Sequence, residues 1–323
     1  MTITFNQSEA KQWSRMGPRA MFGQFMIELA KKNKNLMVLS ADLGRSSGLD
    51  RFKKEFPEKY LSVGIGEQNL IGVAAGLAKE GFKVFVTSFA PFLSMRASEQ
   101  IRMNLGYMKH PVNVVALGSG VSMAYLGNSH FGLEDIAILR SIPNINISAP
   151  SDCAELGKVL FDYAENKRGP SYIRLTGIPG FPNVYDKNYS FAFGKVKQVR
   201  DGKDILLIGC GSVLSQCIEA HDILKKKNIT IKILNVHTLK PIDKTIINTI
   251  NKFKKIVTVE EHTIIGGLGS IISEIIVNNQ IKSELLKIGL PDKFGPTGTY
   301  TYLLDKHGLT GKKITNKILK FYK

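Results

Sequence analysis

Residues 63–81 constrain the fold more than any other stretch of the 323-residue chain. Residues 61–63 have the composition of a strand, and Gly64 and Gly66 then allow a tight turn. Glu67 follows, and after it apolar side chains recur every three or four positions, which is typical of a helix buried along one face: Leu70, Val73, Ala74 and Leu77. This pattern predicts a strand, a turn and a helix, with Glu67 in the first helical turn. An acid there has a simple structural role at the positive end of the helix dipole, but the small residues that follow indicate close packing by a flat ligand or another subunit.

The alternation of strand and helix patterns along the whole chain predicts an α/β protein with two consecutive parallel-sheet domains. Residues 177–193 interrupt every periodic pattern, so the predicted boundaries are a first domain at 1–182, a linker at 183–193 and a second domain at 194–323. Strands are expected at residues 36–39, 61–63, 82–87, 112–117, 145–150 and 171–175 in the first domain, and at 204–208, 229–234 and 256–260 in the second.

Composition agrees with two soluble domains, because 43% of the residues are hydrophobic and 22% are charged. No signal peptide and no apolar run of about 20 residues is found, which predicts a cytoplasmic protein without a membrane partner. The three cysteines are too few and too irregularly spaced for a disulfide scaffold or a zinc site, so we expect buried thiols at Cys153, Cys210 and Cys217.

The formal net charge of +17 raises the question of nucleic-acid binding. The lysines are scattered and do not alternate with aromatic residues as a stacking platform requires, so nucleic acid is not the expected partner. Attraction to anionic sugar phosphates, attraction to an acidic partner chain, and a lysine-rich composition without a function all explain the charge.

The sequence Gly-Ile-Gly-Glu-Gln-Asn at residues 64–69, followed by Gly-Val-Ala-Ala-Gly-Leu-Ala at 72–78, resembles the pyrimidine-binding motif of the transketolase family of thiamine-diphosphate enzymes. The resemblance implies that Glu67 is catalytic, because in that family the glutamate hydrogen-bonds a ring nitrogen of the aminopyrimidine and promotes formation of the ylid. Residues 260–270 resemble the carboxyl-terminal domain that transketolases share with deoxyxylulose-phosphate synthases and the β subunits of 2-oxoacid dehydrogenases. The two expected domains are therefore a pyrimidine-binding domain and a transketolase C-terminal domain.

The resemblance also implies cofactor-binding residues beside Glu67. Phe89 and Phe92, at the carboxyl end of an expected strand, match the aromatic pair that walls the pyrimidine, with Phe92 as the stacking face; core packing is the structural alternative. Asp42 ends another expected strand, where open parallel sheets place ligand-facing residues; a capping role on the following turn is the alternative. Arg96 and Arg102 match a helix in which we expect structural pairing with neighbours.

His130 resembles the family histidine that hydrogen-bonds the donor sugar near its reacting carbonyl, and it is the second expected catalytic residue. Arg19 and Arg174 resemble arginines that bind a substrate phosphate; a solvated side chain is the alternative for Arg19 and a structural salt bridge for Arg174. Residues 123–130 read Met-Ala-Tyr-Leu-Gly-Asn-Ser-His, where sugar transketolases carry Gly-Glu-Asp-Gly-x-Thr-His. This departure leaves the acceptor substrate open.

The Gly-Asp-Gly motif with which these enzymes bind Mg²⁺ and the diphosphate does not occur in this sequence. We therefore predict no metal ligand in this chain and a split enzyme, in which a separate amino-terminal subunit supplies the Mg²⁺ and diphosphate site, most simply in an α2β2 assembly. The expected function is that of the C-terminal subunit of a thiamine-diphosphate-dependent transketolase, which moves a two-carbon ketol unit from a ketose phosphate to an aldehyde. The alternatives are a deoxyxylulose-phosphate-synthase-like or 2-oxoacid-dehydrogenase β-type subunit and a non-catalytic interaction subunit.

Overall fold

In the computed structural model, which describes residues 3–323, the first part of the chain forms a seven-stranded sheet. The strand order is β10-β5-β6-β4-β3-β1-β2, and all neighbouring strands are parallel except for the antiparallel pair β10 and β5. The parallel sheet expected from the sequence is therefore confirmed. Its strands are β1 (Leu36–Ser40), β2 (Tyr60–Ser62), β3 (Lys83–Phe89), β4 (Val112–Leu117), β5 (Asn146–Ser148), β6 (Ser171–Arg174) and β10 (Thr238–Lys240).

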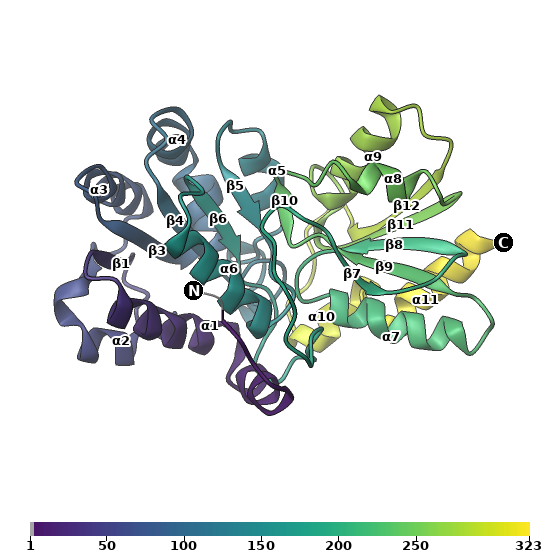
Figure 1. Cartoon of the computed structure of the whole chain (residues 1–323), viewed down its shortest axis with the longest axis horizontal. Helices are drawn as coiled ribbons and strands as arrows, with labels where there is room; N and C mark the ends of the chain where they lie inside the picture. The colour runs from purple at the N-terminus through teal and green to yellow at the C-terminus, as the bar shows by residue number, and fades with distance from the viewer. Residues whose placement is uncertain (1–2) are drawn as a thin grey trace.

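Helices cover both faces of this sheet (Figure 1). Side chains of β3 point alternately to the two faces and are buried on both: Phe85 packs with α1, α2 and α6, whereas Val84 and Val86 pack with α3, α5 and η2. The helices are α1 (Gln7–Lys32), α2 (Asp50–Glu55), α3 (Glu67–Lys79), α4 (Ser98–Gln100), α5 (Asp135–Arg140) and α6 (Cys153–Glu165), with shorter 3₁₀ or π segments η1 (Pro57–Lys59), η2 (Phe92–Arg96), η3 (Ile101–Tyr107) and η4 (Ala124–Ser129).

Helix α1 consists of two parts that meet at Gly17. Gly17 has φ 81° and ψ 168°, which breaks the helix, and Pro18 starts it again, as a proline at a first helical position does. The earlier part begins at Asn6, whose side chain accepts a hydrogen bond from the Glu9 backbone.

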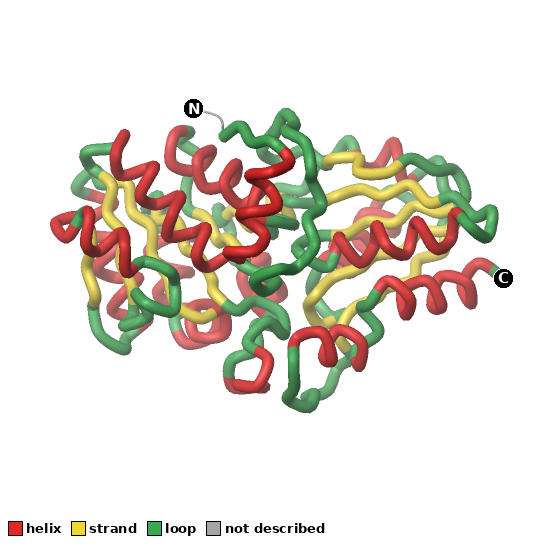
Figure 2. Tube along the Cα trace, turned by 90° about the horizontal axis from the view of Figure 1, so that it is seen from below, coloured by secondary structure: helices red, strands yellow, loops and turns green. Residues whose placement is uncertain are grey.

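The second part of the chain forms a five-stranded sheet in the order β12-β11-β8-β9-β7, parallel apart from β7. Helices α7, α10 and α11 pack on one face and α8 and α9 on the other, and Figure 2 shows the helices of both units lying over their strands. The elements are β7 (Lys197–Arg200), β8 (Ile205–Gly209), β9 (Ile231–Asn235), β11 (Lys255–Thr263), β12 (Glu284–Leu290), α7 (Leu214–Lys225), α8 (Ile246–Ile250), α9 (Leu268–Asn278), α10 (Tyr300–Lys306) and α11 (Gly311–Tyr322).

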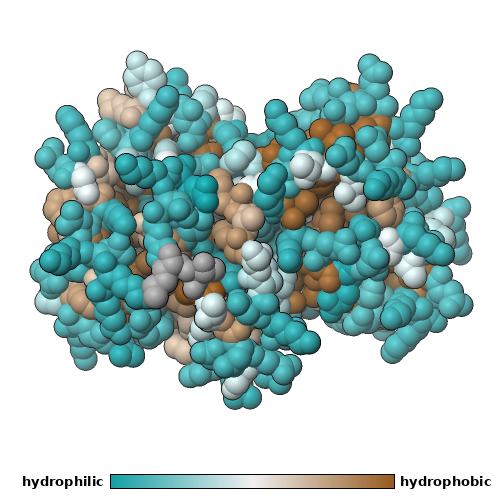
Figure 3. Space-filling view, viewed as in Figure 1, coloured by the Kyte–Doolittle hydropathy of each residue, from teal (hydrophilic) through white to brown (hydrophobic). Residues whose placement is uncertain are grey.

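The two sheets are joined where the chain crosses between them. Strand β10 lies in the expected second domain by sequence, yet Thr238 pairs with Ser148 of β5 in the first sheet. Ala149, just after β5, forms two backbone hydrogen bonds with the second unit: its amide donates to the carbonyl of His237, and its carbonyl accepts from the amide of Gly211. The units are thus linked by backbone hydrogen bonds, and hydrophobic surface shows along their boundary in Figure 3.

The stretch predicted as a linker, residues 183–193, contains no strand or helix, but it packs closely on the first unit. The backbone amides of Val184 and Tyr185 both donate to Asp152 Oδ2, at 3.0 and 2.8 Å. The Tyr189 hydroxyl donates to Glu155 Oε1 at 2.7 Å. The segment is therefore bound to the start of α6.

A buried ion pair lies at the boundary of the two units. Arg174 and Asp135 are 1% and 0% exposed, and Arg174 Nε lies 2.8 Å from Asp135 Oδ2. Arg174 Nη2 also donates to the carbonyls of Gly132 in the first unit and Glu261 in the second, at 3.1 and 3.2 Å. The guanidinium thus forms the structural salt bridge that was the alternative to the predicted phosphate-binding role of Arg174, and the carboxylate and two carbonyls bind it away from solvent.

Two further expectations concern membrane spans and thiols. Within residues 3–323, none of the helices combines the length and the apolar character that crossing a lipid bilayer requires. Cys153, Cys210 and Cys217 are free and buried, as predicted. Burial raises the pKa of all three thiols, so they are poor nucleophiles at neutral pH.

We predict that Arg174→Met lowers the free energy of unfolding by about 3–5 kcal/mol, because it leaves the Asp135 carboxylate buried without its cation. Urea unfolding of the full chain measures this change. Arg168→Met is the matched control, since Arg168 is 35% exposed in its pair with Asp162 and its loss should cost about 1 kcal/mol or less. Equal effects of the two substitutions would contradict the prediction.

Candidate active site

Five of the predicted site residues lie at or after the carboxyl ends of β1 to β4, the edge at which open parallel sheets bind ligands: Asp42 after β1, Glu67 after β2, Phe89 and Phe92 at the end of β3, and His130 in the loop after β4. The turn after β2 brings in Glu67, because Gly64 takes φ 74° there and the chain enters α3 at Glu67. β3 ends in Ser88 and Phe89, and neighbouring strand residues point to opposite faces. Ser88 thus faces α3, and Phe89 faces the segment that contains His130.

Glu67 is a buried acid with both oxygens engaged. It is 2% exposed and forms an ion pair with Arg96, whose Nη1 donates to Oε2 at 2.7 Å. Ser88 Oγ donates to Oε1 at 2.7 Å. Arg96 is 47% exposed, so the carboxylate is fixed on its inner side by Ser88 and meets a solvated partner on its outer side. The structural pairing predicted for Arg96 is confirmed, and its partner is the proposed catalytic acid.

Phe89, Phe92 and His130 form an aromatic cluster beside this pair. The ring centroids of Phe89 and Phe92 are 6.0 Å apart, and the His130 ring lies 5.3 Å from each, all in edge-to-face arrangements. The Arg96 guanidinium carbon lies 4.3 Å from the Phe92 centroid, within cation–π range. Phe92 and Arg96 open and close the π-helical segment η2, which places the arginine back over the phenyl ring.

His130 is half-buried at the end of a loop that leaves β4 at Gly118 and includes η4. Ser129 Oγ lies 2.9 Å from its Nδ1, so the imidazole is oriented by its neighbour and by the two phenyl rings. The structure therefore brings together four of the predicted site residues: Glu67, Phe89, Phe92 and His130.

Arg19 lies on α1 close to the same loop. Its Nη2 donates to the sulfur of Met123 at 3.2 Å, and burial lowers the pKa of its guanidinium below the usual value. Asp42 follows β1 in an exposed position with φ 57°. It lies at the same edge of the sheet but outside the aromatic cluster.

Sequence reasoning missed a set of buried polar groups on β11 that reaches this loop. Glu261 Oε1 accepts from the Val121 amide at 2.8 Å, and its Oε2 accepts from the Tyr300 hydroxyl at 2.7 Å. Burial raises the pKa of Glu260 and of Glu261 to about 7, and burial with Arg174 nearby lowers the pKa of His262 to about 4. The sequence signal was present, because a Glu-Glu-His run within an apolar strand requires buried partners.

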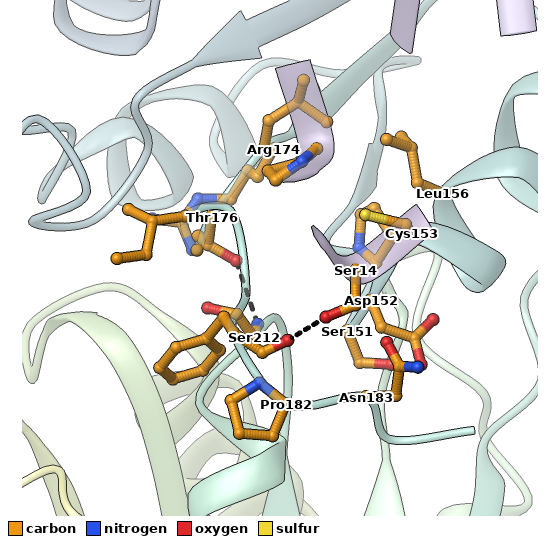
Figure 4. A pocket seen from close by; sticks show the side chains of 16 residues that line it. Ser14, Ser151, Asp152, Cys153, Leu156, Arg174, Thr176, Pro182, Asn183 and Ser212 are labelled. Carbon is orange, nitrogen blue, oxygen red and sulfur yellow. Dashed lines mark hydrogen bonds between the residues drawn. The ribbon is translucent and has the colours of Figure 1, made fainter. Parts of the chain in front are cut away.

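A small, partly open cavity of about 30 Å³ lies between α1, the start of α6 and Ser212 (Figure 4). Ser14 Oγ donates to the Phe181 carbonyl at 2.6 Å, and the Ser212 amide donates to Thr176 Oγ1 at 3.0 Å. This volume is close to that of one water molecule. Of the predicted site residues only Arg174 lines it. Among residues 3–323 there is also no group of three or more His, Cys, Asp or Glu side chains that could hold a metal ion.

Comparison with known proteins gives two family matches. The model of the transketolase pyrimidine-binding domain matches residues 15–177, and that of the transketolase C-terminal domain matches residues 194–314. Together they span both units of the structure.

Similar proteins match almost from end to end. A putative transketolase C-terminal section from Methanocaldococcus jannaschii is 42% identical over 310 residues, covering 94% of this chain and 96% of that protein. One of the subunits of the apulose-4-phosphate transketolase of Phocaeicola vulgatus is 34% identical, with 94% and 97% covered. A solved structure of a split-gene transketolase, described as an inactive β4 tetramer, is 34% identical, with 94% and 97% covered and a TM-score of 0.83.

The raised pKa of Glu261 predicts a pH-dependent stability. Between pH 4.5 and about pH 7, the Glu261 carboxyl keeps its proton in the folded chain but has lost it in the unfolded chain. The resulting stabilisation is complete below pH 4.5 and is lost as the pH rises through about 7. Glu261→Gln removes this titration. From about pH 4.5 to about pH 8, the wild type should lose about 3 kcal/mol of unfolding free energy relative to the variant. Urea unfolding at both pH values measures this, and parallel pH profiles would contradict it.

Proposed function

The chain belongs to the transketolase family, as a counterpart of the carboxyl-terminal subunits of its split members, and on this basis we propose that it supplies half of a thiamine-diphosphate active site. In this proposal a two-carbon ketol unit passes from a ketose phosphate to an aldehyde acceptor. The chain acts together with a separate amino-terminal subunit. The observation that carries the proposal is the position of the Arg96 guanidinium, which contacts Glu67 Oε2 and lies over the Phe92 ring at the same time.

The site fits the aminopyrimidine of thiamine diphosphate. A planar group with N–H donors already spans the Glu67 carboxylate and the Phe92 face, and these are the two contacts that a pyrimidine requires. Because Arg96 is 47% exposed, water can solvate its guanidinium when it leaves these contacts, while the pyrimidine would take over the buried Glu67 oxygen that otherwise loses its partner. When bound, the cofactor supplies the nucleophilic carbon that attacks the ketose carbonyl.

Each residue of the site then has a defined task. Ser88 fixes Glu67 Oε1, so that Oε2 is aimed at the ring nitrogen with which it shares a proton. Phe89 and Phe92 wall the ring and exclude water from one side. His130, held against both rings, donates a hydrogen bond to a substrate oxygen near the reacting carbonyl.

Arg19 is proposed to bind the substrate phosphate. Within the described part of the chain its guanidinium is bonded only to a thioether sulfur, a weak acceptor, and burial has removed much of its hydration. A half-buried cation without an acid is well suited to an anionic ligand. Asp42 remains a proposed cofactor contact from its place at the end of β1.

The amino-terminal subunit is proposed to hold Mg²⁺ and the diphosphate, because the Gly-Asp-Gly motif is absent from this sequence. The exposed side of α3 offers room for close packing. A Cβ atom added at Gly72 or Gly76 would meet no atom within 4 Å, so another backbone can approach this helix directly. An α2β2 assembly is the simplest form of this partnership.

We predict that Glu67→Gln lowers ketol transfer at least about hundredfold, because the amide cannot share a proton as the acid does. The chain is co-expressed with the transketolase-like amino-terminal subunit of the same genome, and thiamine diphosphate with Mg²⁺ is titrated into the purified complex. Glu80→Gln, at the exposed end of the same helix, is the control and should retain full activity. A wild-type complex that binds the cofactor but transfers no ketol unit would overturn the proposed reaction.

Phe92→Leu should weaken the affinity of the complex for thiamine diphosphate about five- to tenfold, since it removes the aromatic face but keeps an apolar side chain. The cofactor concentration at half-maximal activity measures this. Phe82→Leu is the matched control, because Phe82 is 36% exposed and directly precedes β3, at the end of the strand opposite to Phe89. If both substitutions shift the cofactor affinity equally, Phe92 is not the stacking face.

A further inference from the structure

We propose that Glu261, on β11 of the second unit, is a positioning residue for His130. Its carboxylate holds the loop of residues 118–132 in the shape that places the imidazole against Phe89 and Phe92. The inference rests on the proposed function for the importance of His130, and it assigns the C-terminal unit a part in shaping the active site.

The ends of this loop are joined to each other. The Gly120 amide donates to the Gly132 carbonyl at 2.8 Å, and the Gly132 amide donates to the Gly120 carbonyl at 3.0 Å. His130 lies two residues before the second end, and Val121 follows the first. A group that fixes Gly120 and Val121 therefore also fixes the backbone next to His130.

Glu261 is that group. Its Oε1 accepts from the Val121 amide at 2.8 Å, and Gly120 packs so closely on the carboxylate that a Cβ there would lie 2.2 Å from Oε1. Gly120 has φ 71°, a conformation that glycine tolerates best. The backbone at this end of the loop is thus shaped to the carboxylate.

The other carboxylate oxygen of Glu261 and its main-chain carbonyl form hydrogen bonds within the second unit and with Arg174, which also binds the other end of the loop. Its Oε2 accepts from the hydroxyls of Tyr300 and Ser212, at 2.7 and 3.2 Å. Its main-chain carbonyl and that of Gly132 both accept from Arg174 Nη2. Both ends of the loop therefore connect to one residue of β11.

A second, more exposed contact supports the loop just before His130. Asn128 Nδ2 donates to the Gly295 carbonyl at 2.9 Å, and the Gly295 amide donates to Asn128 Oδ1 at 3.3 Å. Gly127 lies against Thr297, whose Cγ2 would be 2.5 Å from an added Cβ. The segment between β12 and α10 thus holds the tip of the loop, while Glu261 holds its base.

The buried Glu261 contact should contribute more to the position of the loop than the exposed Asn128 contact does. Glu261 is 1% exposed, so its removal leaves the Val121 amide without its acceptor in the interior. The Tyr300 hydroxyl loses its shorter contact and keeps only Ser212 Oγ, at 3.1 Å. The loop has only the short η4 segment as regular structure, and segments of this kind open readily once their ties are lost.

Glu260 provides a matched control on the same strand. It is also 1% exposed, but it points to the other face of the sheet, where its carboxylate accepts from the amides of Leu268 and Gly269 at 2.7 and 2.8 Å. Loss of this side chain removes a similar number of buried hydrogen bonds at the start of α9, away from the His130 loop.

A double-mutant cycle in the complex with the amino-terminal subunit tests whether Glu261 acts through His130. Glu261→Ala should lower kcat at least about tenfold, and adding it to His130→Ala should cost less than about twofold more, because the residue that it positions is already gone. Glu261→Gln should restore most of the turnover, since the amide oxygen still accepts from Val121. For Glu260→Ala, the factor by which kcat falls should multiply with the factor for His130→Ala, because the two residues act independently. Full multiplication for Glu261→Ala as well would overturn the inference.

Hydrogen exchange of the isolated full-length chain gives a readout that does not depend on turnover. Glu261→Ala should speed amide exchange in residues 119–132 about tenfold or more, whereas Glu260→Ala should speed exchange at the start of α9 and leave the loop unchanged. If the wild-type complex shows no ketol transfer, the proposed function fails while this measurement still decides the loop contact. Unchanged loop exchange in Glu261→Ala would overturn the inference whatever the activity.

Discussion

The Arg174 guanidinium is the contact on which the arrangement of the two units depends. It neutralises Asp135 at the start of α5 and donates to carbonyls on both sides of the domain boundary. A charge held this far from water must be matched by acceptors in a fixed geometry. The orientation of β11 relative to the first sheet, and with it the place of Glu261 beside the His130 loop, follows from that requirement.

The candidate site uses a different balance between buried and exposed groups. Glu67 is held on its inner side by Ser88, and the aromatic rings around His130 are packed edge to face. On its outer side, the Glu67 carboxylate contacts the Arg96 side chain, which is half exposed. The acid and the aromatic rings are fixed, and the Arg96 side chain can move aside, so the planar ligand proposed for this site could enter without a change in the core.

Much of the fold and of the candidate site was predictable from the sequence, because strand composition, glycine turns and helical spacing are local patterns. Strand composition located β1, β3, β4 and β6 within a few residues, and the glycine turn before a helical pattern located Glu67 at the first position of α3. The grouping of Phe89 and Phe92 follows from their positions at one strand end. The role of Arg174 was harder to predict, since an arginine at the end of a strand can bind a phosphate or form a salt bridge, and the sequence does not show which neighbours it has.

The sequence by itself determined the α/β class and the family resemblance, and it indicated the acid, aromatic and histidine residues proposed for the site, because these inferences depend on periodicity and on short motifs. Only the tertiary structure decided which side chains meet: Arg96 with Glu67, Glu261 with Val121, and β10 with β5 across the expected domain boundary. These contacts join residues that are far apart in the chain. Their partners are selected by burial, since each polar group removed from water must find its acceptor or donor in whatever part of the fold packs against it.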